Sequence, residues 1–312
     1  NILAAIAGII VGIYFGALPG IGSPVLLAIM LPFSLFLPTT SALILMGASY
    51  MGVVYGGSIT AVLLNVPGDP TSIVTALDGY PFTVQGKAKV GLTIATTSSF
   101  VGGLFGVLLL ILVSQPLTKI ILQFGPAEVF FVVVFAILVV IASIVRMVPP
   151  IYALVSGALG ILVGQIGFHT VTGGMRFTLG WSYLYDSLPL IPVIVGVFAI
   201  NEAFSLIAKP GTISKTGKLT GSVMEGVRAT FRRPITLIRS SLIGAFIGAV
   251  PGTGGVVANF VSYMLGKQFS KNPDEFGKGS VDGLICAEAS NNACVGTTLI
   301  PTLSMGIPGS VS

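Results

Sequence analysis

The residues of this chain best suited to bind a ligand are two Pro-Gly pairs in apolar surroundings, Pro19-Gly20 and Pro251-Gly252. Proline removes a backbone donor and glycine allows unusual backbone angles, so each pair predicts a break in a helix. The free N–H groups at the start of the next helix favour an anion. We therefore predict two anion-binding loops, formed by Pro19, Gly20, Gly22 and Ser23 and by Pro251, Gly252, Gly254 and Gly255.

Both pairs belong to an internal repeat. Glycine and proline occur at identical spacing in Gly12–Gly22 (GIYFGALPGIG) and Gly244–Gly254 (GAFIGAVPGTG). Each copy continues to a longer span that ends in a second pair, Pro67-Gly68 or Pro308-Gly309. Broken helices are tolerated in a bilayer only inside protein or beside a water-filled cavity, and paired breaks in corresponding halves indicate a transporter's central site. The alternative is that each pair merely ends a helix at the surface.

Polar side chains accompany the second break of each copy and are candidate substrate ligands. In the first copy the candidates are Gly57, Ser58, Thr60, Asn65, Pro67 and Gly68, and in the second they are Asn291, Asn292, Thr297, Thr298, Pro308 and Gly309. Hydroxyl and amide groups there can donate hydrogen bonds to a carboxylate. The alternative for serine and threonine is a hydrogen bond to their own helix backbone, which is common in membrane helices.

Glu288 is a candidate for coupling transport to an ion, because an acid within an apolar span is costly and usually functional. It could neutralise Na⁺ or carry a proton; the alternative is a cap at a wet start of the last span. A candidate Na⁺ site is formed by Asn65, Gly68, Gly306 and Gly309. Asp69 and Asp78 are interpreted as turn residues.

The elements that position these residues are membrane helices. The chain is 54% hydrophobic and 8% charged with a mean hydropathy of +1.00, whereas soluble domains carry roughly 25% charged residues. Predicted spans are Ile2–Leu18, Thr40–Leu64, Val90–Val113, Val129–Val145, Ile151–Ile166, Leu188–Ala208, Leu237–Val250 and Leu284–Met305. Pro24–Leu37 and Val256–Leu265 are too short to cross alone and suit re-entrant or half-helices. The predicted fold is all-α, a polytopic membrane protein with inverted repeats and broken helices.

The basic residues divide the chain into two repeats. Seven of the fifteen lie between Lys209 and Arg239, which predicts a cytoplasmic connection by the positive-inside rule. The expected units are a first transmembrane repeat at 1–208, a basic linker at 209–235 and a second repeat at 236–312. A nucleic-acid or membrane-surface role for the basic stretch is the alternative.

An enzyme is not expected, because the residues that catalysis requires are missing from the apolar segments. Cys286 and Cys294 read as small buried hydrophobes, and His169, the one histidine, lies in a predicted loop. No helix presents two acids on one face, so an intramembrane enzyme lacks a nucleophile with its base. A channel is the closer alternative, since broken helices also build selectivity filters.

The chain resembles the large permease subunit of tripartite tricarboxylate transporters, the TctA family, over essentially its whole length. The matching strings are Gly16–Gly22, Tyr55–Thr60, Leu64–Gly68, Asp78–Pro81, Gly86–Ala88, Thr172-Gly173, Arg176–Thr178 with Gly180, Glu288–Ala293 and Gly306–Gly309. Members of the family continue beyond the second Pro-Gly of the second repeat, so this second repeat is expected to be truncated and the chain to be a fragment of a longer permease.

The resemblance implies a multi-pass permease of the bacterial inner membrane that imports citrate-like carboxylates. It implies two partners, a small TctB-like membrane subunit and a periplasmic TctC-like solute-binding protein. It also implies secondary active transport, a symport driven by a Na⁺ or H⁺ gradient, with no cofactor. The chain carries no Walker-type ATP-binding loop.

Overall fold

A computed structural model gives the fold of the protein. It describes residues 1–18, 21–121, 149–169, 173–188 and 221–306, with isolated positions at 123, 125, 127, 128, 130, 131, 134, 138, 193, 204 and 310. Within these residues the regular secondary structure is helical except for one hairpin of two short antiparallel strands, in which Gly167 pairs with Arg176. The all-α prediction is therefore confirmed.

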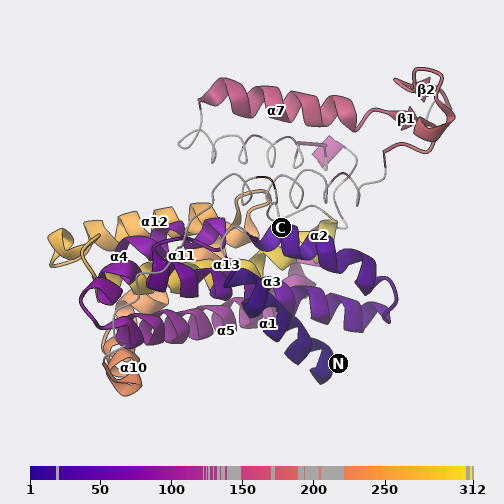
Figure 1. The fold of residues 1–312 in the computed structure, drawn as a ribbon. Helices are drawn as coiled ribbons and strands as arrows, with labels where there is room; N and C mark the ends of the chain where they lie inside the picture. Colours follow the sequence, from indigo (N-terminus) through magenta and orange to yellow (C-terminus); the bar gives the residue numbers. More distant parts are fainter. Residues whose placement is uncertain are drawn as a thin grey trace.

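The described elements include the same series of helices twice, α1, α2 and α3 in the first part and α11, α12 and α13 in the last (Figure 1). The first part contains α1 (Ile2–Gly16), α2 (Ser23–Ser34), α3 (Thr39–Leu64), the 3-10 helix η1 (Pro70–Ser72), α4 (Ile73–Val84) and α5 (Ala88–Ile121). Next come α7 (Pro150–Val163), β1 (Gly167–Phe168), β2 (Met175–Arg176) and η2 (Ser182–Leu184). The last part contains α10 (Val223–Phe231), α11 (Pro234–Ala249), α12 (Gly254–Gln268), η4 (Pro273–Glu275) and α13 (Val281–Met305).

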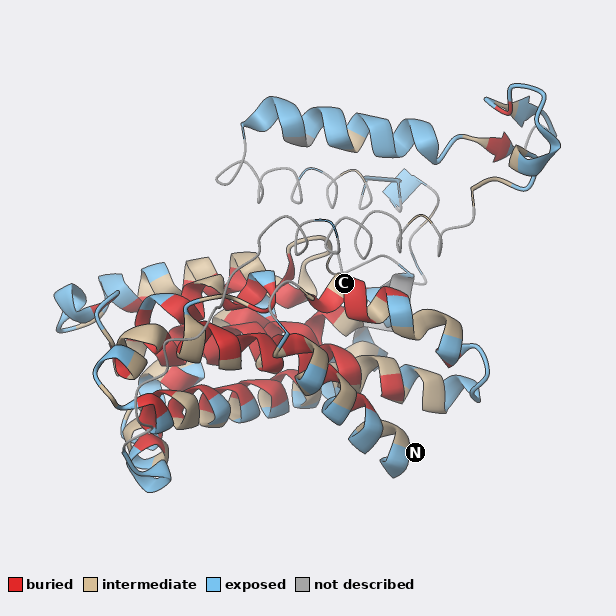
Figure 2. Ribbon diagram, in the orientation of Figure 1, coloured by how far each residue is buried: buried red, intermediate tan, exposed pale blue. Residues whose placement is uncertain are grey.

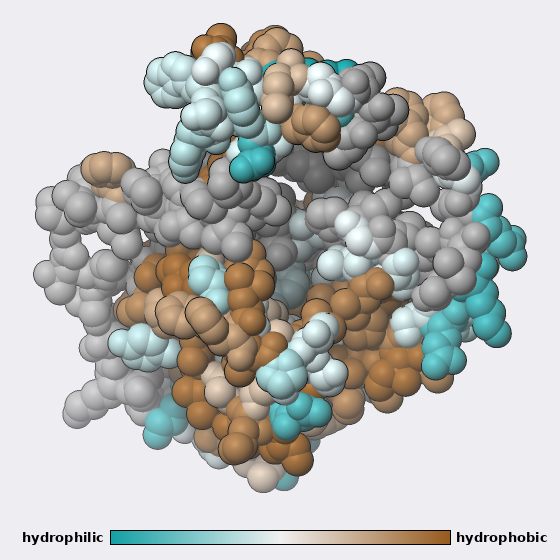
Figure 3. Space-filling view, turned by 90° about the vertical axis from the view of Figure 1, so that its right-hand side faces the viewer, coloured by the Kyte–Doolittle hydropathy of each residue, from teal (hydrophilic) through white to brown (hydrophobic). Residues whose placement is uncertain are grey.

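The outer surface of the bundle suits a lipid environment. Two described helices, α3 and the Ala88–Pro116 part of α5, are long and apolar enough to cross a membrane. Large apolar side chains of α1 and α5 are exposed, among them Ile2, Leu3, Ile6, Ile10, Phe100, Leu104, Ile111 and Leu112. Figure 3 shows hydrophobic side chains gathered over the lower part of one face of the molecule. A large exposed apolar patch is unusual on a soluble monomer.

The centre of the bundle is built around α13, which is buried over most of its length (Figure 2). One buried cluster joins Leu284, Ile285 and Ala289 to α3, α4, α5 and α11, and a second joins Val295 to α2 and α3. A helix that is buried all round must fill its neighbours' grooves with apolar groups. Its polar residues therefore need partners within the protein.

The internal repeat is also a repeat of packing. A Cβ atom added at Gly12 would overlap the carbonyl oxygen of Ser49 on α3, and one added at Gly244 would overlap that of Ser290 on α13. These contacts are equivalent in the repeat. Gly244 lies 232 residues after Gly12, and Ser290 lies 241 residues after Ser49. Thus α1 packs on α3 as α11 packs on α13, by backbone contact at glycine.

The ends of the two long helices also correspond. Helix α3 ends at Asn65 with φ 57°, and α13 ends at Gly306 with φ 66°, both in the left-handed region. Asparagine and glycine tolerate this conformation best, and a left-handed residue is a common way to stop a helix. The second Pro-Gly of each repeat thus follows a helix stop of the same kind.

Several predicted boundaries differ from the structure. The segment after Pro67-Gly68, where Asp69 and Asp78 were predicted as turn residues, contains η1 and the twelve-residue helix α4, because its polar side chains find partners in the protein interior. The predicted loop around His169 contains the β1–β2 hairpin, and the predicted basic linker contains α10. The predicted spans Val129–Val145 and Leu188–Ala208, and the proposed boundary at 208, lie mainly or entirely outside the described residues.

Candidate functional site

A buried carboxylate stands at the centre of the polar residues of the bundle. Glu288 is fully buried in α13. Its Oε1 accepts hydrogen bonds from the hydroxyl of Ser58 on α3 at 2.7 Å and from that of Thr75 on α4. Its Oε2 accepts from the hydroxyl of Ser99 on α5 at 2.5 Å. Three helices thus each direct one hydroxyl at a single carboxylate.

The position of Glu288 rules out its interpretation as a cap of the last span. Helix α13 begins at Val281, two turns before Glu288, and its start is capped by the Ser280 hydroxyl, which accepts from Gly283 N. Asp282 occupies the first turn, where it pairs with Arg233 at 3.0 Å and accepts from Thr236. The acidic residue at the solvent-accessible start of α13 is therefore Asp282 and not Glu288.

A second buried carboxylate, that of Asp69, lies at the start of α2, the helix that follows Pro19-Gly20. The backbone N–H of Ser23 donates to Asp69 Oδ2 at 2.6 Å, and the Asp69 side chain also accepts from the N–H and hydroxyl of Thr71. Asp69 is 1% exposed and caps η1, as expected of a turn residue. The predicted loop members Gly22 and Ser23 thus lie beside Asp69, whereas Pro19 and Gly20 lie outside the described residues.

In the second repeat, a neutral residue lies at the start of α12, the helix that follows Pro251-Gly252. A Cβ atom at Gly254 would lie 3.3 Å from the Cβ of Ser310, and one at Gly255 would lie 2.9 Å from Thr71. Ser310 follows Pro308-Gly309 as Asp69 follows Pro67-Gly68. The start of α12 therefore faces a serine where the start of α2 faces a carboxylate. Gly252 adopts φ 81°, which glycine accommodates without strain.

The residues that follow Pro67-Gly68 and Pro308-Gly309 each contact the other repeat. Asn259 of α12 donates to the carbonyl oxygen of Thr71 in η1 and accepts from Ser290 at 3.1 Å. In the other direction, the Tyr50 hydroxyl of α3 lies 3.2 Å from the hydroxyl of Ser310. Each repeat therefore contacts the segment that follows the last Pro-Gly pair of the other repeat. Asn259 contacts Thr71, which follows Pro67-Gly68, and Tyr50 contacts Ser310, which follows Pro308-Gly309.

The other predicted ligands make mostly local contacts. Thr60, Asn292, Thr297 and Thr298 each bond a backbone oxygen three or four residues away in their own helix. Asn291 differs from them, because it is fully buried and neither its amide nitrogen nor its amide oxygen has a hydrogen-bond partner among the described residues. A buried amide without partners is uncommon and costly.

The backbone positions predicted for Na⁺ have structural roles in the described residues. Asn65 and Gly306 are the left-handed caps of α3 and α13, and the N–H of Gly68 donates to the carbonyl oxygen of Gly57 at 3.3 Å. Pro67 is partly buried after the cap, and Pro251 precedes the turn into α12. Pro308 and Gly309 lie outside the described residues.

Sequence reasoning missed several partners of the site. Thr75, Ser99, Ser72 and Asn259 are small polar residues in helical segments, and their spacing carries no signal. Asp78 was expected in a turn but is fully buried in α4, where Oδ1 accepts from the N–H groups of Gly277, Gly279 and Ser280 and Oδ2 accepts from the Tyr263 hydroxyl. Asp78 therefore fixes the loop that leads into α13.

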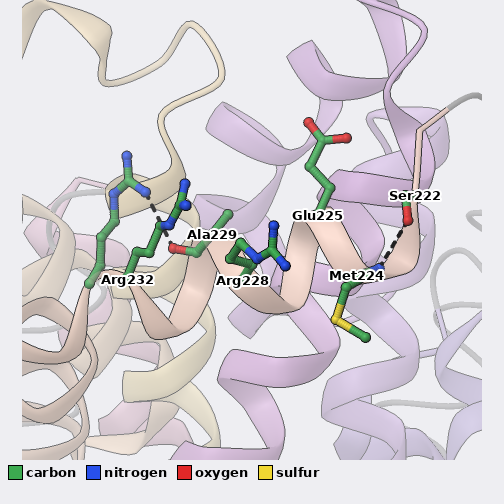
Figure 4. Close-up of a pocket in the computed structure, with 7 residues that line it drawn as sticks. Ser222, Met224, Glu225, Arg228, Ala229 and Arg232 are labelled. Atoms are coloured by element: carbon green, nitrogen blue, oxygen red, sulfur yellow. Dashed lines mark hydrogen bonds between the residues drawn. The ribbon is translucent and has the colours of Figure 1, made fainter.

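The described residues form two cavities, one of which is lined by residues of the site. One of about 340 Å³ opens between α1, α3 and α5, with Tyr55, Thr96, Ser99 and Asn292 among mostly apolar lining residues. The other, of about 480 Å³, runs along α10 and is shown in Figure 4. Its exposed Arg228 and Arg232 give it a basic character, and it contains none of the break residues.

The described residues contain no cluster of three or more histidine, cysteine, aspartate or glutamate side chains that could hold a metal ion. Cys286 and Cys294 are both buried and free, as predicted. The polar site therefore consists of carboxylates, hydroxyls, amides and backbone groups. Such a set binds ions and hydrogen-bonding solutes.

Comparison with known proteins identifies the family. The family model "Tripartite tricarboxylate transporter TctA family" matches residues 2–312. An uncharacterized 52.8 kDa protein in the TAR-I ttuC' 3'region of Agrobacterium vitis is 36% identical over 310 residues, which cover 99% of this chain and 61% of that protein. An uncharacterized protein in the TAR-II ttuC' 3'region of the same organism is 48% identical over 65 residues, 21% of this chain and 27% of that protein.

The chain thus spans about 61% of the length of the relative that it matches from end to end. No solved structure matches it. The family consists of components of membrane transporters and not of enzymes, in agreement with the apolar bundle and the prediction from sequence. The chain belongs to the tripartite tricarboxylate transporter TctA family.

Proposed function

We propose that this chain is the solute-translocating part of a permease that imports carboxylates through the site between its two breaks. The observation that carries the proposal is the carboxylate of Asp69, which lies 2.6 Å from the first N–H group of α2. The start of this helix thus holds a carboxylate by the geometry that an anionic substrate would use. The equivalent point in the second repeat, beside Gly254, faces the neutral Ser310.

This asymmetry favours the second loop as the site of substrate binding. Asp69 fills the first loop with a negative charge of the protein itself, and a second anion there would be repelled. The start of α12 has no acidic partner among the described residues. The backbone N–H groups of Gly254 and Gly255 and the buried amide of Asn291 are the proposed substrate donors.

The proposed transporter requires two partner proteins and is driven by an ion gradient. A small membrane subunit and a periplasmic solute-binding protein complete the transporter in the bacterial inner membrane. Citrate-like carboxylates enter by symport with Na⁺ or H⁺, and Glu288 is the proposed coupling residue. Family membership supports the tripartite assembly, and the burial of Glu288 supports a role in ion coupling.

The test is uptake in proteoliposomes that contain the full-length protein with both partner components. A panel of radiolabelled mono-, di- and tricarboxylates is offered under imposed Na⁺ or H⁺ gradients. Saturable uptake of a carboxylate that requires the binding protein and a gradient is the expected result. Conductance without the binding protein would indicate a channel instead, and absence of any carboxylate flux would contradict the proposal.

A further inference from the structure

We infer that Glu288 binds and releases a proton, and that Ser58 and Ser72 connect its charge to the first break. The inference rests on the proposed function, because the proton would accompany the solute. It begins with the geometry of the carboxylate. Glu288 accepts hydrogen bonds from Ser58, Thr75 and Ser99, which come from three different helices, and is itself fully buried.

No positive charge faces this carboxylate in the described part of the chain. The titratable or charged groups on the helices packed against it are Tyr50 and Tyr55 on α3, Asp78 and Tyr80 on α4, Lys89 and Lys119 on α5, Arg228 and Glu225 on α10, Arg239 on α11, Tyr263 and Lys267 on α12, and Asp282, Cys286 and Cys294 on α13. Lys89 precedes Ser99 by ten residues, a separation of about 15 Å along the axis. Asp78 is already satisfied by Tyr263 and three N–H groups.

The nearest arginine along α13 lies on another side of the helix. Arg239 stacks on Phe269, with its guanidinium carbon 5.7 Å from the ring centre, and interacts electrostatically with Cys286. Cys286 and Glu288 are two residues apart, so their side chains point about 200° apart around the helix. Among the residues that the structure describes, Glu288 therefore has hydroxyl partners but no ionic partner. A buried carboxylate in that position must be neutralised by a proton or a bound cation at some stage.

The spacing of the oxygens favours the proton. The Ser58 and Ser99 hydroxyl oxygens lie 2.7 and 2.5 Å from the carboxylate oxygens, the range of direct O–H···O bonds. Oxygens that share one metal cation at 2.0–2.6 Å are about 3 Å or more apart. The hydroxyls thus occupy the space that a metal ion would need between them and the carboxylate.

Ser58 supplies the rearrangement that protonation requires. When Oε1 carries the proton, its O–H donates to Ser58 Oγ, and the Ser58 hydroxyl turns to the carbonyl oxygen of Val54 at 3.4 Å. When the acid releases its proton, the O–H bond of Glu288 breaks and a water molecule accepts the proton. The Ser58 hydroxyl then donates to Oε1 again. Both states leave every hydroxyl with an acceptor.

The same serine connects the carboxylate to the first break. Ser58 Oγ lies 3.3 Å from Ser72 Oγ. Ser72 is the last residue of η1, and its N–H donates to the carbonyl oxygen of Asp69 at 2.9 Å. Asp69 holds the start of α2. A change in the charge of Glu288 therefore reaches the break loop through Ser58, Ser72 and Asp69.

The direct test is infrared spectroscopy of the full-length protein over a range of pH. We expect a carbonyl band of a buried carboxylic acid that disappears as the pH rises and is absent in Glu288→Gln. Ser99→Ala removes a donor to the ionised form, so the band should persist to higher pH. Ser241→Ala is the matched control, because this buried hydroxyl bonds only its own helix at Leu237, and it should leave the midpoint unchanged.

The inference is overturned by a spectrum without a pH-sensitive band assignable to Glu288, or by a Ser99→Ala midpoint that stays in place. It is also overturned if Na⁺ at constant pH removes the band. In proteoliposomes, accumulation driven by a pH gradient should be lost in Glu288→Gln and kept in the control Asp282→Asn. A wild-type protein that moves no carboxylate would refute the proposed function, while the infrared titration would still decide the protonation of Glu288.

Discussion

At Asp78 one side chain holds together two distant parts of the chain. Its carboxylate accepts three backbone N–H groups from residues 277–280 and the hydroxyl of Tyr263. All these donors lose their partner if the carboxylate is removed. The N–H of Ser280 is buried and those of Gly277 and Gly279 are less so, and a buried donor without a partner costs about 1–3 kcal/mol. The burial of Asp78 in α4 was not predictable from its neighbours, because Asp-Gly is also a frequent turn sequence.

Asp78→Ala is therefore expected to lower the free energy of unfolding by about 3 kcal/mol or more. The measurement is the thermal midpoint of the purified protein in detergent. Asp282→Asn is the control, because its partly exposed pair with Arg233 is the kind of ion pair worth about 0–1 kcal/mol. Equal midpoints for the two variants would show that Asp78 does not fix the loop before α13.

Individual residues of the site were predictable to different degrees. Glu288 was recognisable because an acid is conspicuous in an apolar span. Its partners Thr75 and Ser99 were not, since hydroxyl residues occur throughout membrane helices and usually bond their own backbone. The three hydroxyls lie 189 to 230 residues before Glu288 in the sequence, and only the packing of α13 against α3, α4 and α5 brings them to its carboxylate.

At the scale of the elements, glycine sets the distances between helices. Helices α1 and α11 approach their partners so closely that a Cβ atom at Gly12, Gly16, Gly244 or Gly248 would overlap neighbouring atoms. This packing follows from the sequence, because the glycines recur four residues apart in both copies. Helix α4 did not follow from it, since its short and partly polar segment resembles a connection.

Gly244→Ala should therefore force α11 away from α13 and destabilise the protein by about 1–3 kcal/mol. Gly160→Ala in α7 is the matched control, because an added Cβ there meets no atom of the described residues within 4 Å. Alanine also favours a helix over glycine, so the control should be neutral or slightly stabilising. The comparison uses thermal midpoints in detergent, and a destabilised control with a normal Gly244→Ala would contradict the packing.

At the scale of the whole molecule, two copies of one unit bring their breaks together with different charges. The repeat, the breaks and the order of the principal helices could be predicted from the spacing of glycine and proline. The asymmetry could not, because it lies in one residue after each second Pro-Gly: Asp69 in the first copy and Ser310 in the second. Its meaning appears only when both residues are seen at the starts of α2 and α12.

The central claim is that a substrate carboxylate binds at the start of α12, in the place that Asp69 takes at the start of α2. The most direct measurement compares uptake of a transported carboxylate by wild type, Ser310→Asn and Ser310→Asp, each as the full-length protein with its partners. The new carboxylate of Ser310→Asp should occupy the loop and abolish uptake, whereas the similarly sized, neutral Ser310→Asn should retain most of it. Equal uptake by the two variants would contradict the account.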